Sequence, residues 1–283
     1  KIPNAHKIKD KATGGYFNGQ ELIFMVLVTD LVTIPVGYRF YVPDPALSAW
    51  RKEDKRLKNK GIKAKDRPNT PKPNDIDYPK KQDLALSMLQ EFRDNFPEIA
   101  VKSIVADALY GTDDFMEKAS TQTKKDDKKV QTVSQIRSNQ IVSSKNSTTS
   151  VEQYFARQAG VEHVLKIRGG KAQKVTILAA RLHVKAHGKR RYVVALKYES
   201  EMDYRFLVAT DLSWRFLDIV KIYTLRWLVE VFIQDWKAHC GWNKLSKQQG
   251  EKGSERGLIV SLLCDHLLML HPEQSNRLKN KQP

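Results

Sequence analysis

The hydrophobic pattern near the start of the chain predicts two neighbouring strands. Glu21 to Thr29 (ELIFMVLVT) is an uninterrupted apolar run, typical of a strand that is buried on both faces. A second run, TIPVGYRFYV, follows Asp30 and ends before Pro43. We therefore expect two adjacent strands joined by a short turn at Asp30.

A helix and two further strands are predicted after residue 80. Residues 83–96 place their apolar side chains on one face at helical spacing, and Pro97 ends the helix. VKSIVADALYG (101–111) reads as a short apolar strand closed by Gly111, and residues 130–142 read as another strand.

The second half of the chain changes from strands to helices. The stretches VTILAARLHVKA, RYVVALKYE and YRFLVATD alternate with polar turns between residues 143 and 211, which predicts a β-rich region. From Trp214 onward the pattern is helical, and YTLRWLVEVFIQDWK (Tyr223 to Lys237) reads as one continuous, largely buried helix. Strands mixed with covering helices predict an α/β architecture.

The composition indicates which partners the fold serves. The formal net charge of the 283-residue chain is +17, which favours nucleic acid first and an anionic membrane surface second. The longest apolar runs are shorter than the roughly 20 residues that a membrane span requires, so no membrane partner is expected. Two cysteines are too few for a disulfide framework, which fits the reducing conditions of the cytoplasm. We therefore expect a cytoplasmic protein.

Basic residues concentrate between residues 51 and 81. This segment also contains four prolines and few hydrophobic residues, which predicts a mobile basic excursion without regular structure. It is either a solvated loop or an arm that contacts phosphates.

The apolar helix of residues 223–237 carries a narrow polar stripe. On a wheel of about 100° per residue, four side chains fall within an arc of about 60°; they are Tyr223, Arg226, Glu230 and Lys237. One interpretation is an ordinary surface pair of Arg226 and Glu230 at i, i+4. The other is a site in which Glu230 binds a metal ion and the two cations contact phosphates.

Such a metal site needs a second carboxylate, and Asp107 in SIVADALYG is the candidate. It follows an apolar run, at the carboxyl end of a predicted central strand, where the active-site groups of open α/β sheets gather. The alternative is an Asp that only caps the strand end. Oxygen ligands without a Cys or His cluster indicate Mg²⁺ or Mn²⁺ rather than zinc.

These residues resemble a known family. Tyr223, Arg226, Glu230 and Lys237 match Y-x2-R-x3-E-x6-K, the signature around the catalytic Glu of bacterial insertion-sequence DDE transposases of the IS-four type. ADALYG resembles the segment around the second catalytic Asp of that family. The resemblance implies a ribonuclease-H-like mixed sheet with flanking helices. Its parts would be a catalytic core in residues 1–142, a β-rich insertion in 143–211 and a helical part in 212–283 that completes the core.

The resemblance also implies an activity. Asp107 and Glu230 would bind Mg²⁺ or Mn²⁺, Arg226 and Lys237 would contact DNA near the scissile phosphate, and Tyr223 would support that contact. The protein would cleave DNA and join the element's ends to target DNA, as a homodimer in the bacterial cytoplasm at the nucleoid. The alternatives are a nuclease without strand transfer and a catalytically dead DNA-binding remnant.

One carboxylate of the three in this family is hard to place. Asp10 lacks an apolar strand around it, and Asp30 aligns with the turn that leads to the third strand. We therefore expect that the first strand and its Asp precede Lys1, and that the chain is an amino-terminally truncated fragment.

Overall fold

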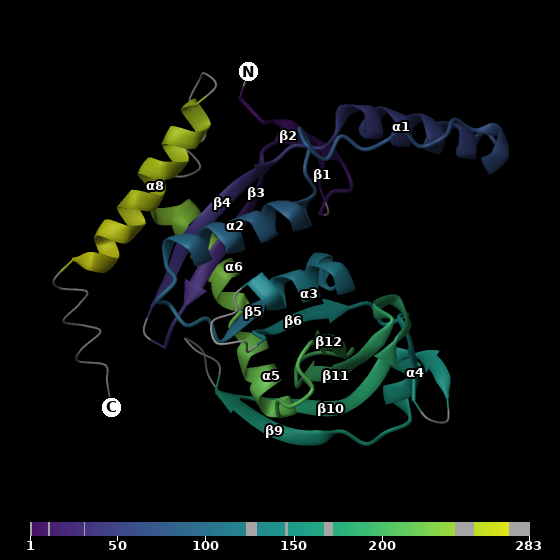
Figure 1. Ribbon diagram of the computed structural model, residues 1–283, viewed down its shortest axis with the longest axis vertical. Helices are drawn as coiled ribbons and strands as arrows, with labels where there is room; N and C mark the ends of the chain where they lie inside the picture. Colours follow the sequence, from purple (N-terminus) through teal and green to yellow (C-terminus); the bar gives the residue numbers. More distant parts are fainter. Residues whose placement is uncertain are drawn as a thin grey trace. The chain divides into compact units, whose positions relative to one another are not determined.

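The computed structural model describes residues 2–10, 12–30, 32–122, 129–144, 147–166, 172–240 and 252–271. The chain forms two compact units, one of residues 1–85 with 235–283 and one of residues 86–234. The boundaries between the units fall within two helices, which are α2 (Lys81–Asn95) and α6 (Trp227–His239). Figure 1 shows the elements of each unit. None of the helices in the described ranges is both long enough and apolar enough to cross a membrane.

The first unit combines two antiparallel hairpins with helices. Besides parts of α2 and α6, its elements are β1 (His6–Lys9), β2 (Tyr16–Gly19), β3 (Glu21–Val28), β4 (Thr33–Tyr41), α1 (Pro45–Asn59), η1 (Ala64–Asp66) and α8 (Gly253–Leu270). β1 pairs with β2 and β3 pairs with β4, so the two predicted strands and the turn at Asp30 are confirmed.

The predicted burial of β3 on both faces is wrong. Ile23 alone of its eight residues is buried, and the other seven are half-buried. The reason is the pairing, because β3 and β4 form a sheet of two strands and no other described strand extends it. A two-stranded sheet does not bury both faces of its strands.

The predicted unstructured excursion between residues 51 and 81 is wrong in its first part, which belongs to helix α1. Asp44 caps this helix by accepting hydrogen bonds from the backbone N–H groups of Ala46 (2.8 Å) and Leu47 (3.3 Å). Pro45 occupies the first helical position, where its missing N–H is not needed. None of the side chains of α1 is buried, so burial of an apolar face does not explain this helix. The Asp44 cap and local side-chain pairs stabilise it instead.

The segment after α1 returns along the helix without forming another long element. Three contacts attach it: the Trp50 indole N–H donates to the carbonyl of Pro68 (2.8 Å), Arg67 pairs with Asp54 (2.7 Å), and the backbone N–H of Asn74 donates to Asp44 (3.1 Å). These contacts order a segment whose composition alone predicts no ordered structure.

The second unit contains an eight-stranded mixed sheet, which confirms the predicted α/β class and is consistent with a ribonuclease-H-like fold. The strand order is β5-β6-β12-β11-β10-β7-β8, with β9 paired to β10. Only β5 and β6 are parallel among these strands. The strands are β5 (Ser103–Val105), β6 (Gln131–Ile136), β7 (Ile141–Ser143), β8 (Thr148–Ser150), β9 (Val161–Lys166), β10 (Ala172–Val184), β11 (Lys189–Tyr198) and β12 (Arg205–Ala209).

The helices of this unit cover both faces of the sheet. They are η2 (Ala108–Tyr110), α3 (Asp113–Gln122), α4 (Val151–Ala156), η3 (Lys185–His187) and α5 (Phe216–Thr224). Ser120 of α3 hydrogen-bonds to Thr132 of β6 (2.9 Å), whereas Val133 packs in the core with Ile219 and Val220 of α5. Since successive strand residues point to opposite faces, α3 and α5 lie on opposite sides of the sheet (Figure 1).

The predicted single strand of residues 130–142 is divided. β6 ends at Ile136, a turn follows in which the N–H of Gln140 donates to the carbonyl of Arg137 (3.1 Å), and β7 begins at Ile141. The strands predicted in the β-rich region are confirmed as β10, β11 and β12. They lie in one sheet with β5 and β6, and the division of the chain at residues 143 and 211 stays a prediction.

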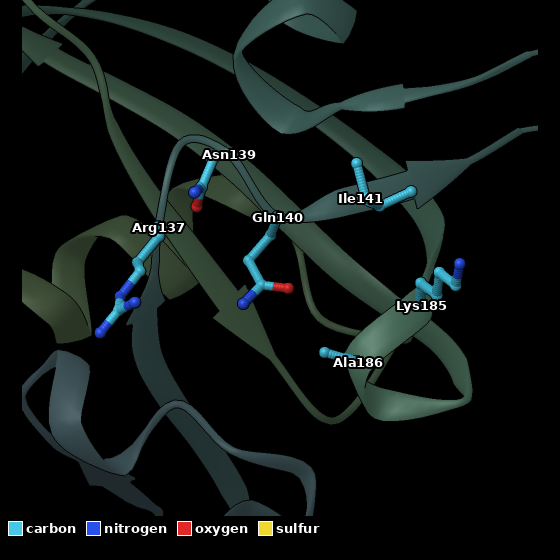
Figure 2. A pocket seen from close by; sticks show the side chains of 6 residues that line it. All are labelled: Arg137, Asn139, Gln140, Ile141, Lys185 and Ala186. Atoms are coloured by element: carbon cyan, nitrogen blue, oxygen red, sulfur yellow. The ribbon is translucent and has the colours of Figure 1, made fainter. Parts of the chain in front are cut away.

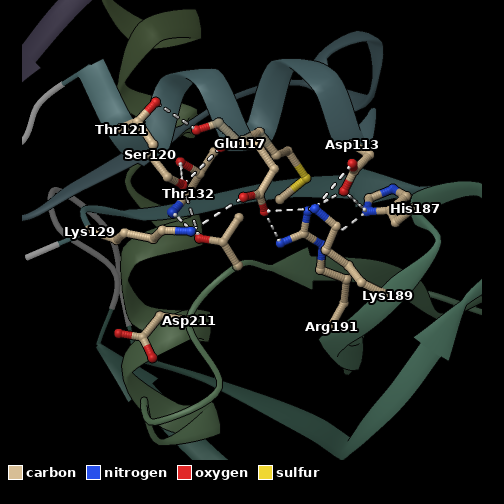
Figure 3. A network of polar contacts seen from close by, with 12 residues as sticks. Asp113, Glu117, Ser120, Thr121, Lys129, Thr132, His187, Lys189, Arg191 and Asp211 are labelled. Atoms are coloured by element: carbon tan, nitrogen blue, oxygen red, sulfur yellow. Dashed lines mark hydrogen bonds and ion pairs between the residues drawn. The ribbon is translucent and has the colours of Figure 1, made fainter.

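A buried ion-pair network joins α3 to the hairpin of β10 and β11 (Figure 3). Arg191 of β11 is 2% exposed and pairs with both Asp113 and Glu117 of α3, the latter at 2.7 Å. Its Nε donates to Nδ1 of His187 (3.1 Å), and Lys189 pairs with the same two carboxylates. Burial of the Arg191 guanidinium is tolerated only because the carboxylates of Asp113 and Glu117 neutralise its charge.

We expect Arg191→Ala to lower the free energy of unfolding by about 3 kcal/mol, because the change leaves two half-buried carboxylates without their main partner. Urea denaturation followed by circular dichroism measures this. Arg190→Ala is the matched control, since Arg190 is exposed and its loss should change the stability by less than about 0.5 kcal/mol. Equal effects of the two substitutions would contradict the assigned role of the network.

The same network predicts lower stability in acid. Burial and the nearby Arg191 charge lower the pKa of His187 below 6.5. Burial alone would raise the pKa of Glu117, but the Arg191 guanidinium outweighs it and the pKa lies below 4.5. Both groups bind protons more readily in the unfolded chain, so stability is full above about pH 6.5 and is lost as the pH falls. His187→Gln should remove the part of this loss that begins below pH 6.5, and thermal unfolding at several pH values tests it.

Candidate active site around Asp107 and Glu230

Asp107 lies immediately beyond the carboxyl end of β5 and is exposed. Its side chain accepts a hydrogen bond from the backbone N–H of Ala108 (2.7 Å) and caps the short helix η2. The predicted place at a strand end is confirmed, but β5 is not a central strand. It is the last strand in the pairing order of the described sheet.

The loop that carries Asp107 is attached to β6. The N–H of Ala106 donates to the carbonyl of Val133 (3.0 Å), which continues the strand ladder by one bond. The Ser134 hydroxyl then donates to the main-chain carbonyl of Asp107 (2.8 Å). The backbone of Asp107 is therefore held by the neighbouring strand while its carboxylate stays open to solvent.

Gly111 ends this loop at a point where no side chain fits. A Cβ at this position would lie 2.1 Å from the carbonyl oxygen of Gln135 in β6, far inside contact distance. His187 contacts the Gly111 carbonyl through Nε2 (3.1 Å). Because Arg191 donates to Nδ1 of the same ring, Nε2 carries the hydrogen and is the donor. The buried network of Figure 3 thus ends on the Asp107 loop.

The predicted continuous helix of residues 223–237 is wrong in one detail. Helix α5 ends at Thr224 and α6 begins at Trp227. Between them, hydrogen bonds run from residue i to residue i−3, as in the bond from the Arg226 N–H to the Tyr223 carbonyl (3.1 Å). Such a tight turn advances the chain by about 120° per residue instead of 100°. Tyr223, which precedes the turn, is therefore rotated about the helix axis relative to Glu230 and Lys237, which follow it.

Three residues of the predicted stripe form one chain of contacts. Tyr223 is 3% exposed and packs in the core, and its hydroxyl accepts a hydrogen bond from the Gln135 side chain. The Arg226 guanidinium lies over the Tyr223 ring, 5.9 Å from its centroid. Arg226 in turn donates to Glu230 Oε1 (2.6 Å), so the buried phenol orients a cation that orients an exposed carboxylate.

The electrostatics of this chain follow from its burial. Burial raises the pKa of the Tyr223 hydroxyl, so the phenol stays protonated at neutral pH. Burial also lowers the pKa of Arg226, but the hydrogen bond that Arg226 donates to Glu230 outweighs this and the pKa is raised. Arg226 is therefore a permanent cation held half-buried between Tyr223 and Glu230.

Lys237, the fourth residue of the signature, is exposed and lies two turns beyond Glu230 on α6. Gln234, at the border of the predicted stripe, is exposed as well. Phe232 and Trp236 on the apolar side are 7% and 1% exposed. The alternation of polar and apolar faces predicted for α6 is thus confirmed.

Strand β6 links the two halves of the candidate site. Ser134 binds the backbone of Asp107, and the next residue, Gln135, binds Tyr223. Within the described parts of the chain, no group of three or more Asp, Glu, His or Cys side chains is arranged to hold a metal ion. Asp107 and Glu230 therefore do not form a complete metal site by themselves.

The two weaker candidates for a first carboxylate have structural places in the first unit. Asp10 accepts hydrogen bonds from the Ala12 N–H (2.9 Å) and the Thr13 hydroxyl (2.7 Å) in the turn between β1 and β2. Asp30 is exposed in the turn between β3 and β4, as the resemblance implies.

Basic residues of the β-rich region between 166 and 191 either contact phosphates or form a solvated face. Arg191 and Lys189 are neutralised by Asp113 and Glu117, so neither offers free charge to a phosphate. Arg168 and Lys171 lie outside the described residues, and three others are exposed: Lys166, Lys174 and Arg190.

Several residues that position the site carry no signal in a single sequence. Ser134, Gln135 and His187 act through contacts with residues at least 27 positions away, and Arg191 reaches the site through its hydrogen bond to His187. Gly111 is different, because a Gly after an apolar run marks a close approach.

Comparison with protein families gives one match. The family described as DDE superfamily endonuclease matches residues 7–194, about two thirds of the chain. The matched range contains Asp107 but ends before Tyr223 and Glu230. The search of curated proteins gave no match.

We expect Gly111→Ala to lower the free energy of unfolding by about 1–3 kcal/mol, because the new methyl group overlaps the backbone of β6. Gly15→Ala is the control, since its Cβ would only touch the Thr13 hydroxyl at 3.4 Å. Denaturation curves of both variants check this, and an unchanged stability of the Gly111 variant would mean that the loop does not pack on Gln135 as described.

Proposed function

Because the chain belongs to the DDE superfamily of endonucleases, which cut DNA with divalent metal ions, generally Mg²⁺, we propose that it is the transposase of a bacterial insertion sequence of the IS-four type. It would cut DNA at the ends of the element and join them to target DNA. The single observation that supports this is the contact chain Tyr223–Arg226–Glu230, built from the residues of the Y-x2-R-x3-E signature.

The proposed roles follow from exposure and pairing. Glu230 and Asp107 present exposed carboxylates and would be metal ligands. Glu230 Oε1 is taken by Arg226, whereas its Oε2 has no partner in the described part of the chain. Arg226 and Lys237 would contact DNA near the scissile phosphate, with Tyr223 holding the Arg226 guanidinium from below.

A bound pair of Mg²⁺ or Mn²⁺ ions would activate a water or a 3′-hydroxyl and stabilise the leaving oxygen. The described residues offer two of the three carboxylates that the resemblance implies. We propose that a further strand supplies the third carboxylate. The position of β5 at the end of the described pairing order supports this, since a further strand could pair there.

A second candidate function is a DNA-binding remnant without catalysis. One observation favours it, because the described residues include no complete cluster of metal ligands. The net charge of +17 serves either function, since both require contact with the DNA backbone. A nuclease without strand transfer would use the same two carboxylates.

The working form is proposed to be a homodimer that acts on DNA in the bacterial cytoplasm, at the nucleoid. Helix α8 supports the dimer, since it exposes apolar side chains that a second copy could cover; these are Ile259, Val260, Leu263 and Leu267.

The test is Mg²⁺-dependent cleavage of DNA that carries the element's ends. We expect cleavage by the parent protein when the further strand with the third carboxylate is included, and a loss of at least about 100-fold in Asp107→Asn and in Glu230→Gln, because each removes a metal ligand. Asp203→Asn, an exposed carboxylate in the turn between β11 and β12, is the control and should cleave normally.

The remaining outcomes separate the candidates. If the parent protein binds DNA tightly but does not cleave it, the protein is a DNA-binding remnant. If it cleaves DNA but does not join the ends to target DNA, it is a nuclease without strand transfer. Full activity of Glu230→Gln would remove Glu230 from the metal site.

A further inference from the structure

An open pocket of about 340 Å³ lies just beyond the carboxyl end of β6 in the second unit. Its walls come from the turn between β6 and β7 and from η3; they are Arg137, Asn139, Gln140, Ile141, Lys185 and Ala186. In Figure 2 the Gln140 amide lies between the two cationic side chains of the pocket. Two cations and two amides thus surround one hollow.

Both walls of the pocket belong to segments that hold the Asp107 loop. Arg137 follows β6 three residues after Ser134, which binds the Asp107 backbone. Three extended residues span at most about 11 Å, so the Arg137 backbone lies within that distance of the Ser134 backbone. On the other wall, Lys185 belongs to the same turn as His187, which binds Gly111 at the end of the loop.

The two cations of the pocket are not neutralised. No carboxylate pairs with Arg137 or Lys185 in the ranges that the structure describes, and both side chains are exposed. Other cations of this unit do have carboxylate partners, as with Arg191 and Glu117, Arg205 and Glu201, or Arg226 and Glu230. Free positive charge beside the site therefore remains available for an anion.

The shape of the pocket indicates a polymeric anion. A site for a small molecule buries most of its ligand, whereas five of the six residues around this hollow are exposed and a ligand would extend beyond it. Arg, Lys, Asn and Gln are the side chains that contact DNA phosphates and sugars. The Ser134 and Arg137 backbones are at most about 11 Å apart. Along the axis of a duplex, this length corresponds to about three phosphates of one strand.

We propose that this pocket binds the phosphodiester backbone of the DNA strand that enters the Asp107 site. Arg137 and Lys185 contact phosphates on the two sides of the hollow, and the amides of Asn139 and Gln140 donate to phosphate or sugar oxygens between them. The assignment of DNA rests on the proposed function. The pocket holds the strand a few nucleotides away from the scissile phosphate and orients it without taking part in the chemistry.

The test compares DNA binding by two variants that lose the same charge. Arg137→Gln/Lys185→Gln removes both pocket cations, and Lys102→Gln/Lys221→Gln removes two exposed cations that both lie near Asp218. Binding of a labelled duplex with the element's end is measured by fluorescence anisotropy without divalent metal, from 50 to 200 mM salt. All four residues are exposed, so both variants should fold, and thermal unfolding verifies this.

We expect the slope of log affinity against log salt to be shallower by about 1–2 in the pocket variant, because about 0.9 is lost for each phosphate contact. The control variant should keep the slope of the parent protein. An equal slope in the pocket variant and the parent would overturn the pocket assignment. If the parent protein does not bind DNA, the proposed function itself fails.

A second measurement separates backbone phosphates from free phosphate. Inorganic phosphate, added at constant ionic strength and followed by NMR chemical shifts of Asn139 and Gln140, should show no saturable binding, because one small anion cannot reach both walls of an open pocket. Saturable binding of inorganic phosphate together with an unchanged DNA slope would assign the pocket to a small anion instead.

Discussion

The close approach of the Asp107 loop to strand β6 is the constraint on which the candidate site depends. Gly111 lies where a Cβ would overlap the carbonyl of Gln135, and Ser134 holds the Asp107 backbone from the same strand. The Gln135 side chain binds Tyr223, which carries Arg226 and Glu230 in turn. Strand β6 therefore acts as the common frame for two carboxylates that are 123 residues apart in the chain.

The buried network around Arg191 extends this frame. It neutralises one guanidinium with two carboxylates of α3 and passes through His187 to the carbonyl of Gly111. A half-satisfied network of this kind would be worse than an apolar core, so all of its members depend on one another. The two basic residues Lys189 and Arg191 are therefore neutralised by carboxylates, whereas Arg137 and Lys185 have no carboxylate partner in the described part of the chain.

Local pattern predicted the elements that apolar residues mark and failed where other forces decide. The strands β10, β11 and β12 and the helix α2 lie where apolar residues predict them, and most of β11 and β12 is buried on both faces. Helix α1 has no buried side chain and depends on Asp44 and Pro45, a start signal that composition masks. The strand of residues 130–142 is split by a turn that no Gly or Pro announces. The tight turn at Arg226 escapes the helical wheel for the same reason, since the wheel assumes one constant angle per residue.

The sequence by itself determined the α/β class, the positive charge, the spacing of Tyr223, Arg226 and Glu230 along the chain, and the place of Asp107 at a strand end. These properties depend on residue order and local periodicity, which a single chain displays directly. The tertiary structure alone decided which cations stay free, which residues of β6 hold the Asp107 loop and Tyr223, and that Gly111 has no room for a side chain. Those outcomes arise from contacts between residues far apart in the chain, and spacing along a sequence does not encode distance in space.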